Sequence, residues 1–416
     1  MNVYVQGFSA LAHYRSSSAT TRIERCPASV RNLADATSSQ RIIADMKIWR
    51  LGIEKPCADH PLEVLVRTRE QRSRSKAVVA RIWKSPLAPT AFRQVASNIY
   101  VSSPEFVFLQ LATKLDLPEL VALGMEFCGT YRRDVEVGGL DPDATGHITI
   151  YHQPPLSTPK RLRGFLNVMK SAPGSARAIK ALDYVLPNSA SPMETSLYLL
   201  LCLPRRLGGY ALPKPMLNPP IVLSKAGRRH TLRNSAKPDL YWKDIKLDLE
   251  FNSTEFHDEN SRASDSMRRK ALERMGVEVI ELTSTELFDT RLFHATVLRL
   301  ALRFNKQLRP ENEGAFAERR ALLRRRLLIE STTKDTEKLQ FGMTEDGTTS
   351  SSEGRWLGES DSLEWTEDPS TWAQESVDDE SWVNDYMDSD DSWFADVFDS
   401  TGEEDDGDLR VFGSES

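Results

Sequence analysis

The chain has 416 residues, with 54 Lys and Arg, 60 Asp and Glu, and a formal net charge of −6. This length allows two or three domains, each with its own hydrophobic core. The overall charge hides two opposed parts. Residues 331–416 contain 26 Asp and Glu against 4 Lys and Arg, a net charge of −22, whereas residues 1–330 carry +16. A body this basic favours a polyanionic partner, of which nucleic acid is the commonest, with a generic basic surface as the alternative.

The cysteine content and the hydropathy exclude several classes of protein. The four cysteines lie far apart and form no Cys-x-x-Cys pair, so the spacing indicates neither a zinc site nor a disulfide framework. Isolated thiols are typical of a reducing compartment. The N-terminus lacks a secretory signal pattern, and no apolar run is long enough to cross a membrane. We therefore expect a soluble, cytoplasmic protein with no membrane partner.

Residues 1–60 are weakly patterned and receive no fold assignment, whereas residues 61–187 are predicted to form a mainly α (α+β) region. Two strand-like runs, 62–66 and 77–83, flank a basic stretch. Helices are then expected from Ser102, which has capping-box spacing to Glu105, and after Asp116. Residues 158–186 combine helical periodicity with many Lys and Arg, which indicates either a solvated surface or one that faces phosphates.

Residues 188–310 are predicted to form an α/β domain. A helix begins after Ser191 and ends before Pro204. Strands are then expected near 220–223, 238–242 and 246–252, a helix near 262–275, a strand over 277–282, and a helix that begins at Thr283 with capping-box spacing to Glu286. This order predicts a mixed sheet with helices on both faces.

Two segments follow this domain. A basic helix is predicted over 311–330, and the composition then changes to Ser, Thr, Asp and Glu with five single tryptophans. Such a segment buries too little apolar surface to offset its ordering entropy, so residues 331–416 are predicted to be a disordered acidic tail. The tail can be a solubility extension. It can also fold back onto the basic body and compete with DNA, with tryptophans stacking where bases would.

Three polar side chains share one face of the strand predicted over 246–252. Side chains alternate with a period of two, so Asp248, Glu250 and Asn252 point the same way. A turn at Lys243 and Asp244 would bring Asp239 and Glu250 together. Converging carboxylates repel one another and are costly to desolvate unless a cation or a proton relieves them. The pattern therefore indicates a divalent-metal site.

Residues 191–305 resemble the PD-(D/E)XK nuclease superfamily, in particular the bacterial domains related to very-short-patch repair endonucleases. The resemblance is carried by Pro238-Asp239, by Glu250 eleven positions on, and by the following His257, Asp265, Arg268, Arg269, Leu272, Gly276 and the strand 277–282. The Ser-Pro-Met-Glu helix start and the segment 212–215 also belong to it. It implies a restriction-endonuclease-like mixed sheet flanked by helices. Residues 65–190 are more faintly similar to the type IV abortive-infection antitoxin.

The resemblance implies a Mg²⁺-dependent DNA endonuclease that hydrolyses phosphodiester bonds. Asp239 and Glu250 would hold the Mg²⁺ or Mn²⁺ ion. Glu194 would hydrogen-bond a water of the metal shell or complete that shell. A cluster on the following helix would contact DNA, namely Arg268, Arg269 and Lys270.

One position departs from the superfamily pattern. Two residues after the second acid the pattern usually has a lysine, and this chain has Asn252. An amide supplies neither positive charge nor a base near neutral pH, and His257 is the substitute we expect, since histidine titrates near neutrality. Three functions stay open: an endonuclease of a defence or mobile-element type, a catalytically degenerate DNA-binding or regulatory protein of the antitoxin type, and a protein-interaction scaffold.

Each of these side chains also has an ordinary structural explanation. Glu194 lies where a capping-box partner of its own helix belongs. Asp248 is more simply explained by an ion pair with Lys or Arg. Asp265 and Arg269 have the i,i+4 spacing of a helical salt bridge. A lone histidine such as His257 is more often packed or solvated than catalytic.

Overall fold

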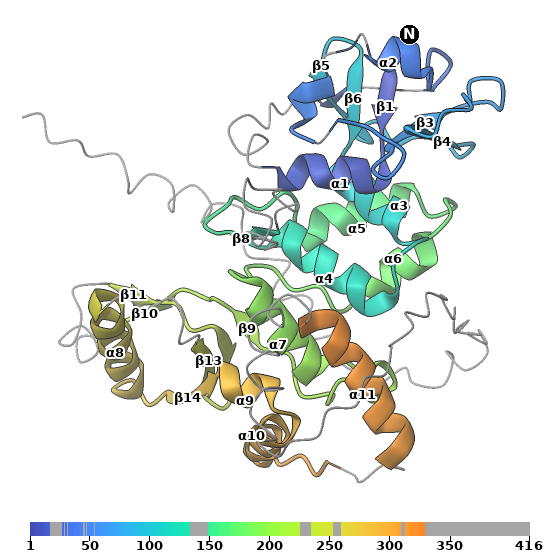
Figure 1. The fold of residues 1–416 in the computed structure, drawn as a ribbon. Coiled ribbons are helices and arrows are strands. Elements are labelled where there is room, and N and C mark those ends of the chain that lie inside the picture. Colours follow the sequence, from blue (N-terminus) through green and yellow to red (C-terminus); the bar gives the residue numbers. More distant parts are fainter. Residues whose placement is uncertain are drawn as a thin grey trace, which may run out of the picture. The chain divides into compact units, whose positions relative to one another are not determined.

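The computed structural model describes residues 1–16, 27–28, 30, 32–44, 46, 48–53, 55–133, 149–224, 234–252, 259–308 and 313–328 (Figure 1). These residues form an α/β fold with mixed sheets and flanking helices. None of the helices in these ranges has both the length and the apolar character needed to cross a membrane. The tail predicted over 331–416 and the candidate His257 lie outside the described residues.

Six strands from the first 102 residues form one mixed sheet in the order β2-β5-β6-β1-β3-β4. They are β1 (Val3–Val5), β2 (Pro27–Ala28), β3 (Leu62–Val66), β4 (Val78–Ile82), β5 (Phe92–Ala96) and β6 (Ile99–Ser102). Strand β1 is parallel to β6 and antiparallel to β3, and β3 is parallel to β4. Residues 1–60 therefore supply an inner strand of this sheet. A strand of three residues is too short for alternation to identify it in the sequence.

Several helices accompany this sheet. The first, α1 (Gly7–Arg15), contacts both β3 and the later helix α3. The helices that follow the sheet in the chain are α3 (Pro104–Leu111), α4 (Leu117–Cys128), α5 (Pro159–Val168) and α6 (Ser175–Leu182). The short elements of this half are α2 (Gln40–Ala44), a 3₁₀ helix (Ile48–Leu51), β7 (Arg132–Arg133) and β8 (Thr149–Ile150).

The predicted helix starts are only partly right. The capping box of α4 is present, with both Asp116 and Glu119 bonded to backbone N–H groups. The one predicted from Ser102 to Glu105 is wrong, because the N-cap of α3 is Ser103, whose hydroxyl accepts the Phe106 N–H. The Ser102 hydroxyl instead donates to the carbonyl of Val5 at 3.1 Å, which ties the end of β6 to β1.

The second sheet has four strands in the order β14-β13-β12-β9. These are β9 (Met216–Leu217), β12 (Leu240–Trp242), β13 (Leu247–Asn252) and β14 (Glu278–Thr283). Strand β12 is antiparallel to β9 and β13, and β14 is parallel to β13. Helix α7 (Pro192–Cys202) and a 3₁₀ turn (Arg205–Leu207) precede the sheet, α8 (Glu259–Glu273) connects β13 to β14, and α9 (Ser284–Phe288) and α10 (Thr290–Arg303) follow.

One strand of this sheet differs from the expectation. The neighbour of β12 is β9, because Leu217 and Met216 pair with Leu240 and Tyr241. The predicted strand near 220–223 is β10 (Ile221–Val222), which pairs with β11 (Ser235–Ala236) in a separate two-stranded sheet. A two-residue strand carries no periodicity of its own, so its pairing is decided by tertiary contacts.

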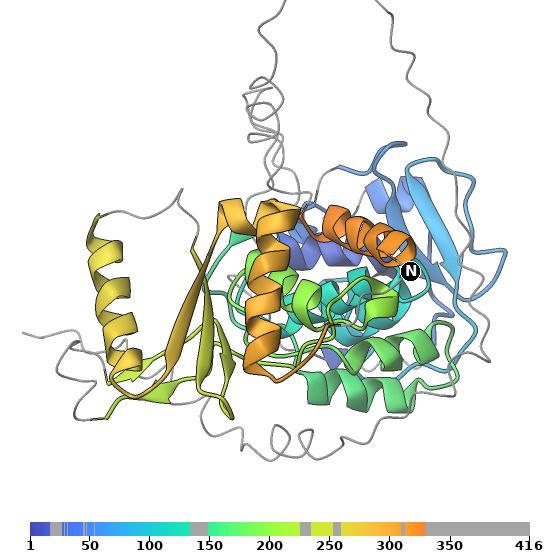
Figure 2. The same ribbon diagram turned by 90° about the horizontal axis from the view of Figure 1, so that it is seen from below.

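The two faces of the four-stranded sheet are covered by different helices, with α8 on one side and α10 on the other (Figure 2). The face of Leu240, Leu249 and Leu282 is fully buried and apolar. On the opposite face, Tyr241 and Val279 pack against a cluster that joins α8 to β10 and β11, formed by Leu223, Ala236, Ala271, Leu272 and Val277. The polar side chains of β13 lie on this α8 side.

The predicted basic helix is α11 (Glu313–Leu328), and it is built into the fold. The hydroxyl of Ser196 on α7 donates to the carbonyl of Leu327. The buried Arg324 donates to the carbonyls of Leu287 and Phe288 at the end of α9. At least part of its basic character therefore serves packing and not an outside partner.

Candidate functional site

A β-hairpin brings Asp239 and Glu250 together. Strands β12 and β13 are antiparallel with Leu240 opposite Leu249, so one further step of the ladder places Asp239 opposite Glu250. The connecting turn is closed by the Lys246 N–H, which donates to the Lys243 carbonyl at 3.2 Å. The carboxylate of Asp239 accepts the N–H of Phe251, the residue after Glu250, at 3.0 Å. The hairpin predicted from the sequence thus joins the two acids at one end of the sheet.

Asp248 and Glu250 form a buried acidic pair on the α8 side of β13. Asp248 is 0% exposed and Glu250 is 5% exposed. Within the described residues, the two oxygens of Asp248 and the Oε1 of Glu250 have no hydrogen-bond partner outside the pair, and a hydrogen bond between the two carboxyl groups is one of the effects that raise the pKa of Asp248. Burial, followed by the negative charges of Glu250 and Asp239, raises the pKa of Asp248 well above its ordinary value. Two ionised carboxylates repel, so their proximity is favourable only with a proton or a cation between them.

The ordinary explanation of Asp248 is therefore wrong for the part of the chain that the structure describes. An ion pair with Lys or Arg was expected, yet no basic side chain among these residues lies within ion-pair distance of Asp248. The nearest basic influence is Arg268, which lowers the pKa of Asp248 only as the last of several effects. Desolvation exceeds this attraction, as it commonly does for an acid that is buried without a direct partner.

Glu194 lies at the start of α7, where its side chain has a local structural role. The Ser191 hydroxyl caps the helix by accepting the Glu194 N–H. The Glu194 carboxylate accepts the Ala190 N–H at 2.9 Å and the Asn218 amide at 2.6 Å. Burial and the nearby charge of Asp239 raise the pKa of Glu194 to about 8. Its carboxylate therefore binds the backbone N–H that precedes the N-cap, in place of the Ser191 N–H of a capping box, and it is an electrostatic neighbour of Asp239.

Asn218 is a site residue that the sequence did not single out. It follows β9, and its backbone N–H donates to the carbonyl of Asp239 at 3.1 Å. Its side-chain amide donates to Glu194 and, at 3.0 Å, to the carbonyl of Asn188. It thereby connects the start of α7 to the segment that carries Asp239. A lone asparagine before two prolines carries no signal for such a role.

Arg268 of α8 faces the carboxylates. Its Nη2 lies 3.3 Å from Glu250 Oε2, and its Nη1 donates to the carbonyl of Lys237 at 2.7 Å. Arg269 pairs with Glu281, the residue beside Glu250 in the parallel register of β13 and β14. Of the three residues expected to contact DNA, only Lys270 is exposed, and the two arginines are engaged in ion pairs.

The remaining candidates are less defined. Asn252 ends β13, is partly buried, and lies beside Thr283 in the parallel register. His257 lies outside the described residues, and so does the side chain of Asp265. The helical salt bridge expected between Asp265 and Arg269 is not among the described interactions, whereas the pair of Arg269 with Glu281 is.

The buried carboxylate oxygens of this site are of the kind that bind a divalent cation, although they are not arranged as a formed metal site. Across the described ranges, no three Asp, Glu, His or Cys side chains already stand in the arrangement of a metal site. The oxygens of Asp248 and the Oε1 of Glu250 nevertheless lack donors and are buried. Carboxylate oxygens are the ligands that Mg²⁺ and Mn²⁺ prefer. A bound cation would relieve the repulsion between the carboxylates of Asp248 and Glu250, and so would a shared proton.

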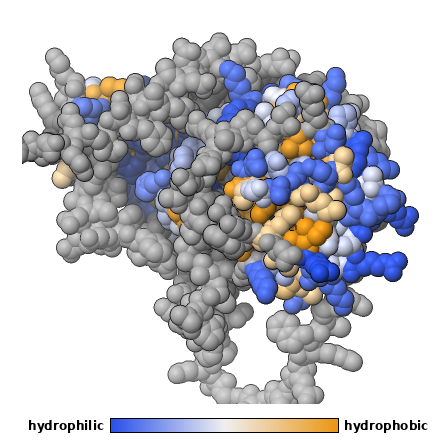
Figure 3. Space-filling model, turned by 90° about the horizontal axis from the view of Figure 1, so that it is seen from above, coloured by the Kyte–Doolittle hydropathy of each residue, from blue (hydrophilic) through white to orange (hydrophobic). Residues whose placement is uncertain are grey.

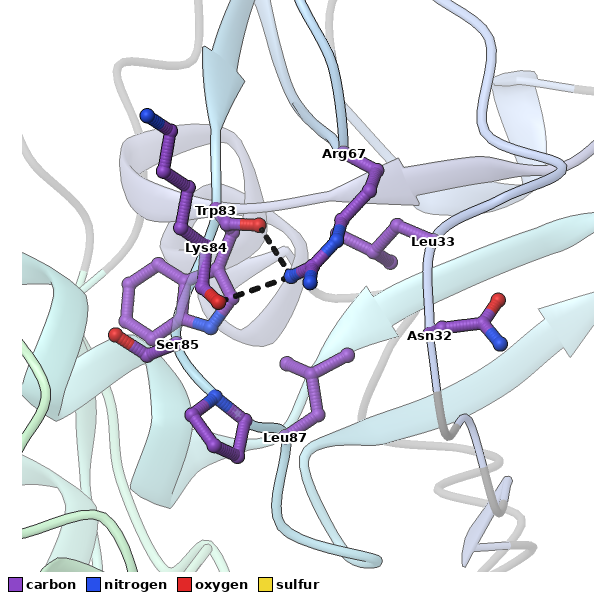
Figure 4. A pocket seen from close by; sticks show the side chains of 8 residues that line it. Asn32, Leu33, Arg67, Trp83, Lys84, Ser85 and Leu87 are labelled. Carbon is purple, nitrogen blue, oxygen red and sulfur yellow. Dashed lines mark hydrogen bonds between the residues drawn. The ribbon is translucent and has the colours of Figure 1, made fainter.

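A pocket in the N-terminal half has a different character (Figure 4). The guanidinium of Arg67 donates to the carbonyls of Trp83 at 3.3 Å and Lys84 at 2.9 Å. The pocket is lined by Asn32, Leu33, Arg67, Trp83, Lys84, Ser85, Pro86 and Leu87. Its lining contains no acid and no histidine, and its charged side chains are Arg67 and Lys84.

Comparisons with known proteins identify no relative. No protein-family model, no curated protein and no solved structure matches this chain.

Proposed function

We propose that residues 188–310 form a restriction-endonuclease-like domain of a cytoplasmic protein that hydrolyses phosphodiester bonds in DNA with a divalent cation. The observation that carries this proposal is the buried pair of Asp248 and Glu250, with oxygens that lack donors, beside Asp239. Burying such groups without compensation costs several kcal/mol. A fold that keeps them at one end of a sheet has the character of a functional site, where strongly perturbed acids collect.

The order of elements supports the same proposal. Helix α7 is followed by strands β9, β12 and β13, then by helix α8 and strand β14. This is the succession of helix, strands, helix and strand that the resemblance implies. It puts the Pro238-Asp239 segment directly before β12, beside the strand that carries Glu250.

In the proposed hydrolysis each side chain of the site has its own role. Asp239 and Glu250 would hold the Mg²⁺ or Mn²⁺ ion, and Asp248 offers further oxygen atoms next to them. When bound, such an ion supplies activation of the attacking water and neutralisation of charge on the phosphate. Arg268 holds a planar cation beside Glu250, which suits a phosphate oxygen. Glu194 acts through Asn218 and positions the Asp239 segment.

A second candidate function is a catalytically degenerate DNA-binding or regulatory protein of the antitoxin type. It is favoured by two observations: Arg268 already places a positive charge at Glu250, and Asn252 supplies none. In such a protein the arginine replaces the cation, and the domain binds DNA without cutting it.

Plasmid nicking by the full-length protein tests the proposal. With Mg²⁺ or Mn²⁺, the native protein nicks supercoiled DNA, and Asp239→Asn and Glu250→Gln abolish nicking because each removes a cation ligand. The matched control is Asp244→Asn, which makes the same charge change in the exposed turn between β12 and β13 and keeps full activity. DNA binding without nicking in either metal would select the degenerate alternative.

A further inference from the structure

A strongly basic surface lies on the connection between β3 and β4, at one edge of the N-terminal sheet (Figure 1). This connection, residues 67–76, is called the basic loop below. It contains a single acid, Glu70, and its five basic side chains are all exposed. On the side of the molecule where β3 and β4 lie, long hydrophilic side chains project outward (Figure 3). The basic residues are Arg67, Arg69, Arg72, Arg74 and Lys76.

The second half of the basic loop alternates between bonded and exposed side chains. The Ser73 hydroxyl donates to the carbonyl of Ser38 at 2.6 Å, and the Ser75 hydroxyl donates to the Gln40 side chain at 2.7 Å. The residues between and after them, Arg72, Arg74 and Lys76, are exposed. This alternation leaves the three cations exposed while the two serines bond to the segment 38–40.

Gln71 holds the first half of the loop. Its side-chain oxygen accepts the N–H groups of Arg67 at 2.7 Å and Thr68 at 3.0 Å. Its amide donates to the carbonyls of Leu33 at 3.2 Å and Ala34 at 2.9 Å. One uncharged side chain therefore ties this turn to a neighbouring segment, and of the five cations of the loop only Arg67 has a printed hydrogen bond from its side chain, to the carbonyls of Trp83 and Lys84.

Four of these charges have no ion pair in the part of the chain that the structure describes. Arg69, Arg72, Arg74 and Lys76 have no acidic partner among the described residues. Like charges held close together repel one another, and this repulsion opposes the ordered loop. A polyanion that crosses the loop would relieve it.

We propose that the basic loop binds the phosphate backbone of a nucleic acid. Arginine predominates in the loop, and its planar fork matches phosphate oxygens in a bidentate way. The hydrogen bonds of Gln71, Ser73 and Ser75 hold the loop before binding, which reduces the ordering entropy that binding costs. Contacts with phosphates position a protein on nucleic acid without reading its sequence. The inference does not depend on cleavage, because the loop and the carboxylates belong to different sheets.

The test measures binding of fluorescent 24-mers to the full-length protein in EDTA, so that cutting plays no part. The probes are duplex DNA, single-stranded DNA and duplex RNA. The variant Arg72→Gln/Arg74→Gln/Lys76→Gln is compared with Arg291→Gln/Arg299→Gln/Arg325→Gln, which removes three exposed charges elsewhere. We expect the loop variant to bind duplex DNA at least tenfold more weakly. The slope of log K against log salt should fall by roughly 0.9 for each phosphate that the variant no longer neutralises.

The control triple variant should keep the native slope. Equal losses in the two triple variants would overturn the proposal, because net charge alone would then explain them. Loop-dependent binding of polyglutamate, without binding of any nucleic acid, would also overturn it and assign the loop to an acidic polypeptide. Among the nucleic acids, the probe that shows the largest loop-dependent loss identifies the source of the phosphates.

A further variant, Gln71→Ala, keeps every charge and removes four hydrogen bonds of the loop. We expect weaker binding with an unchanged net charge, since the cations are no longer held in place. Native affinity of this variant would contradict a loop that is ordered for binding.

Discussion

The guanidinium of Arg268 lies 3.3 Å from the carboxylate of Glu250 and is the basic group that directly contacts the buried acids of β13. Helix α8 carries this arginine across the face of the sheet on which Asp248 and Glu250 lie. Glu250 thus has an ionic partner on one oxygen, whereas its Oε1 and both oxygens of Asp248 have no donor among the described residues. The charge of the site is therefore only partly compensated by the described residues.

Removing the guanidinium of Arg268 should lower the free energy of unfolding, because Glu250 stays buried without its ionic partner. We expect Arg268→Gln to lower the free energy of unfolding by about 2–3 kcal/mol, since a buried carboxylate is left without its cation. The neighbouring Arg269→Gln breaks a half-exposed pair with Glu281 and should cost about 0–1 kcal/mol. Urea denaturation in EDTA measures both values. Equal losses would show that Arg268 does not compensate Glu250.

Asp248→Asn should stabilise the fold, and the gain should depend on pH. Burial raises the pKa of Asp248, so the folded state keeps a proton that the unfolded state releases as pH rises above its ordinary pKa of about 3.9. The free energy of unfolding of the native protein therefore falls with rising pH, and the variant lacks this loss. We expect the variant to melt at a higher temperature at pH 8 and at nearly the native temperature at pH 4.

The control for this prediction is Asp244→Asn, which changes an exposed acid in the neighbouring turn. It should leave the melting temperature unchanged at both pH values. A lower melting temperature of Asp248→Asn at pH 8 would mean that the ionised carboxylate stabilises the fold through a bound cation.

A lysine at position 252 should increase cleavage. Asn252 ends the strand that carries Glu250, and in the proposed endonuclease it takes the position at which a lysine is expected. A positive charge there would stabilise the charge that develops on the phosphate, and we expect Asn252→Lys to raise the nicking rate by about tenfold or more. Asn252→Gln adds no charge and should leave the rate unchanged. A decrease with lysine would argue that the amide itself is needed.

Removal of the acidic tail should strengthen DNA binding at low salt. Deleting residues 331–416 changes the formal net charge of the chain from −6 to +16. The positive potential of the remainder then attracts the DNA polyanion without competition. Anisotropy titrations at two salt concentrations measure the gain, which should shrink as salt rises. Unchanged affinity at low salt would exclude competition by the tail.

The buried arginine of α11 should matter for stability and its exposed neighbour should not. Arg324 donates to the carbonyls of Leu287 and Phe288, so Arg324→Ala leaves these groups without donors and should cost about 2 kcal/mol. Arg325 is exposed, and Arg325→Ala should change the free energy of unfolding by less than about 0.5 kcal/mol. Thermal melting of the two variants side by side checks this. Similar melting temperatures would show that α11 packs weakly on α9.

The features that could be predicted from the sequence depend on interactions between residues that are close together in the chain. Alternation with a period of two placed Asp248, Glu250 and Asn252 on one face of β13, and the turn at 243–246 brought Asp239 opposite Glu250. The capping box from Thr283 to Glu286 is also present. Each of these features depends on residues a few positions apart or on one hairpin, where backbone geometry leaves few alternatives.

Contacts between distant segments explain the rest. The pairing of β9 with β12 and the ion pair of Arg268 with Glu250 each join residues that are more than 15 positions apart, and the complete burial of Asp248 likewise depends on tertiary packing. Ser102 likewise loses its predicted capping role because Val5, nearly a hundred residues earlier, takes its hydroxyl. The free energy of a buried charge depends on everything that surrounds it, and those surroundings exist only after the helices have packed on the sheet.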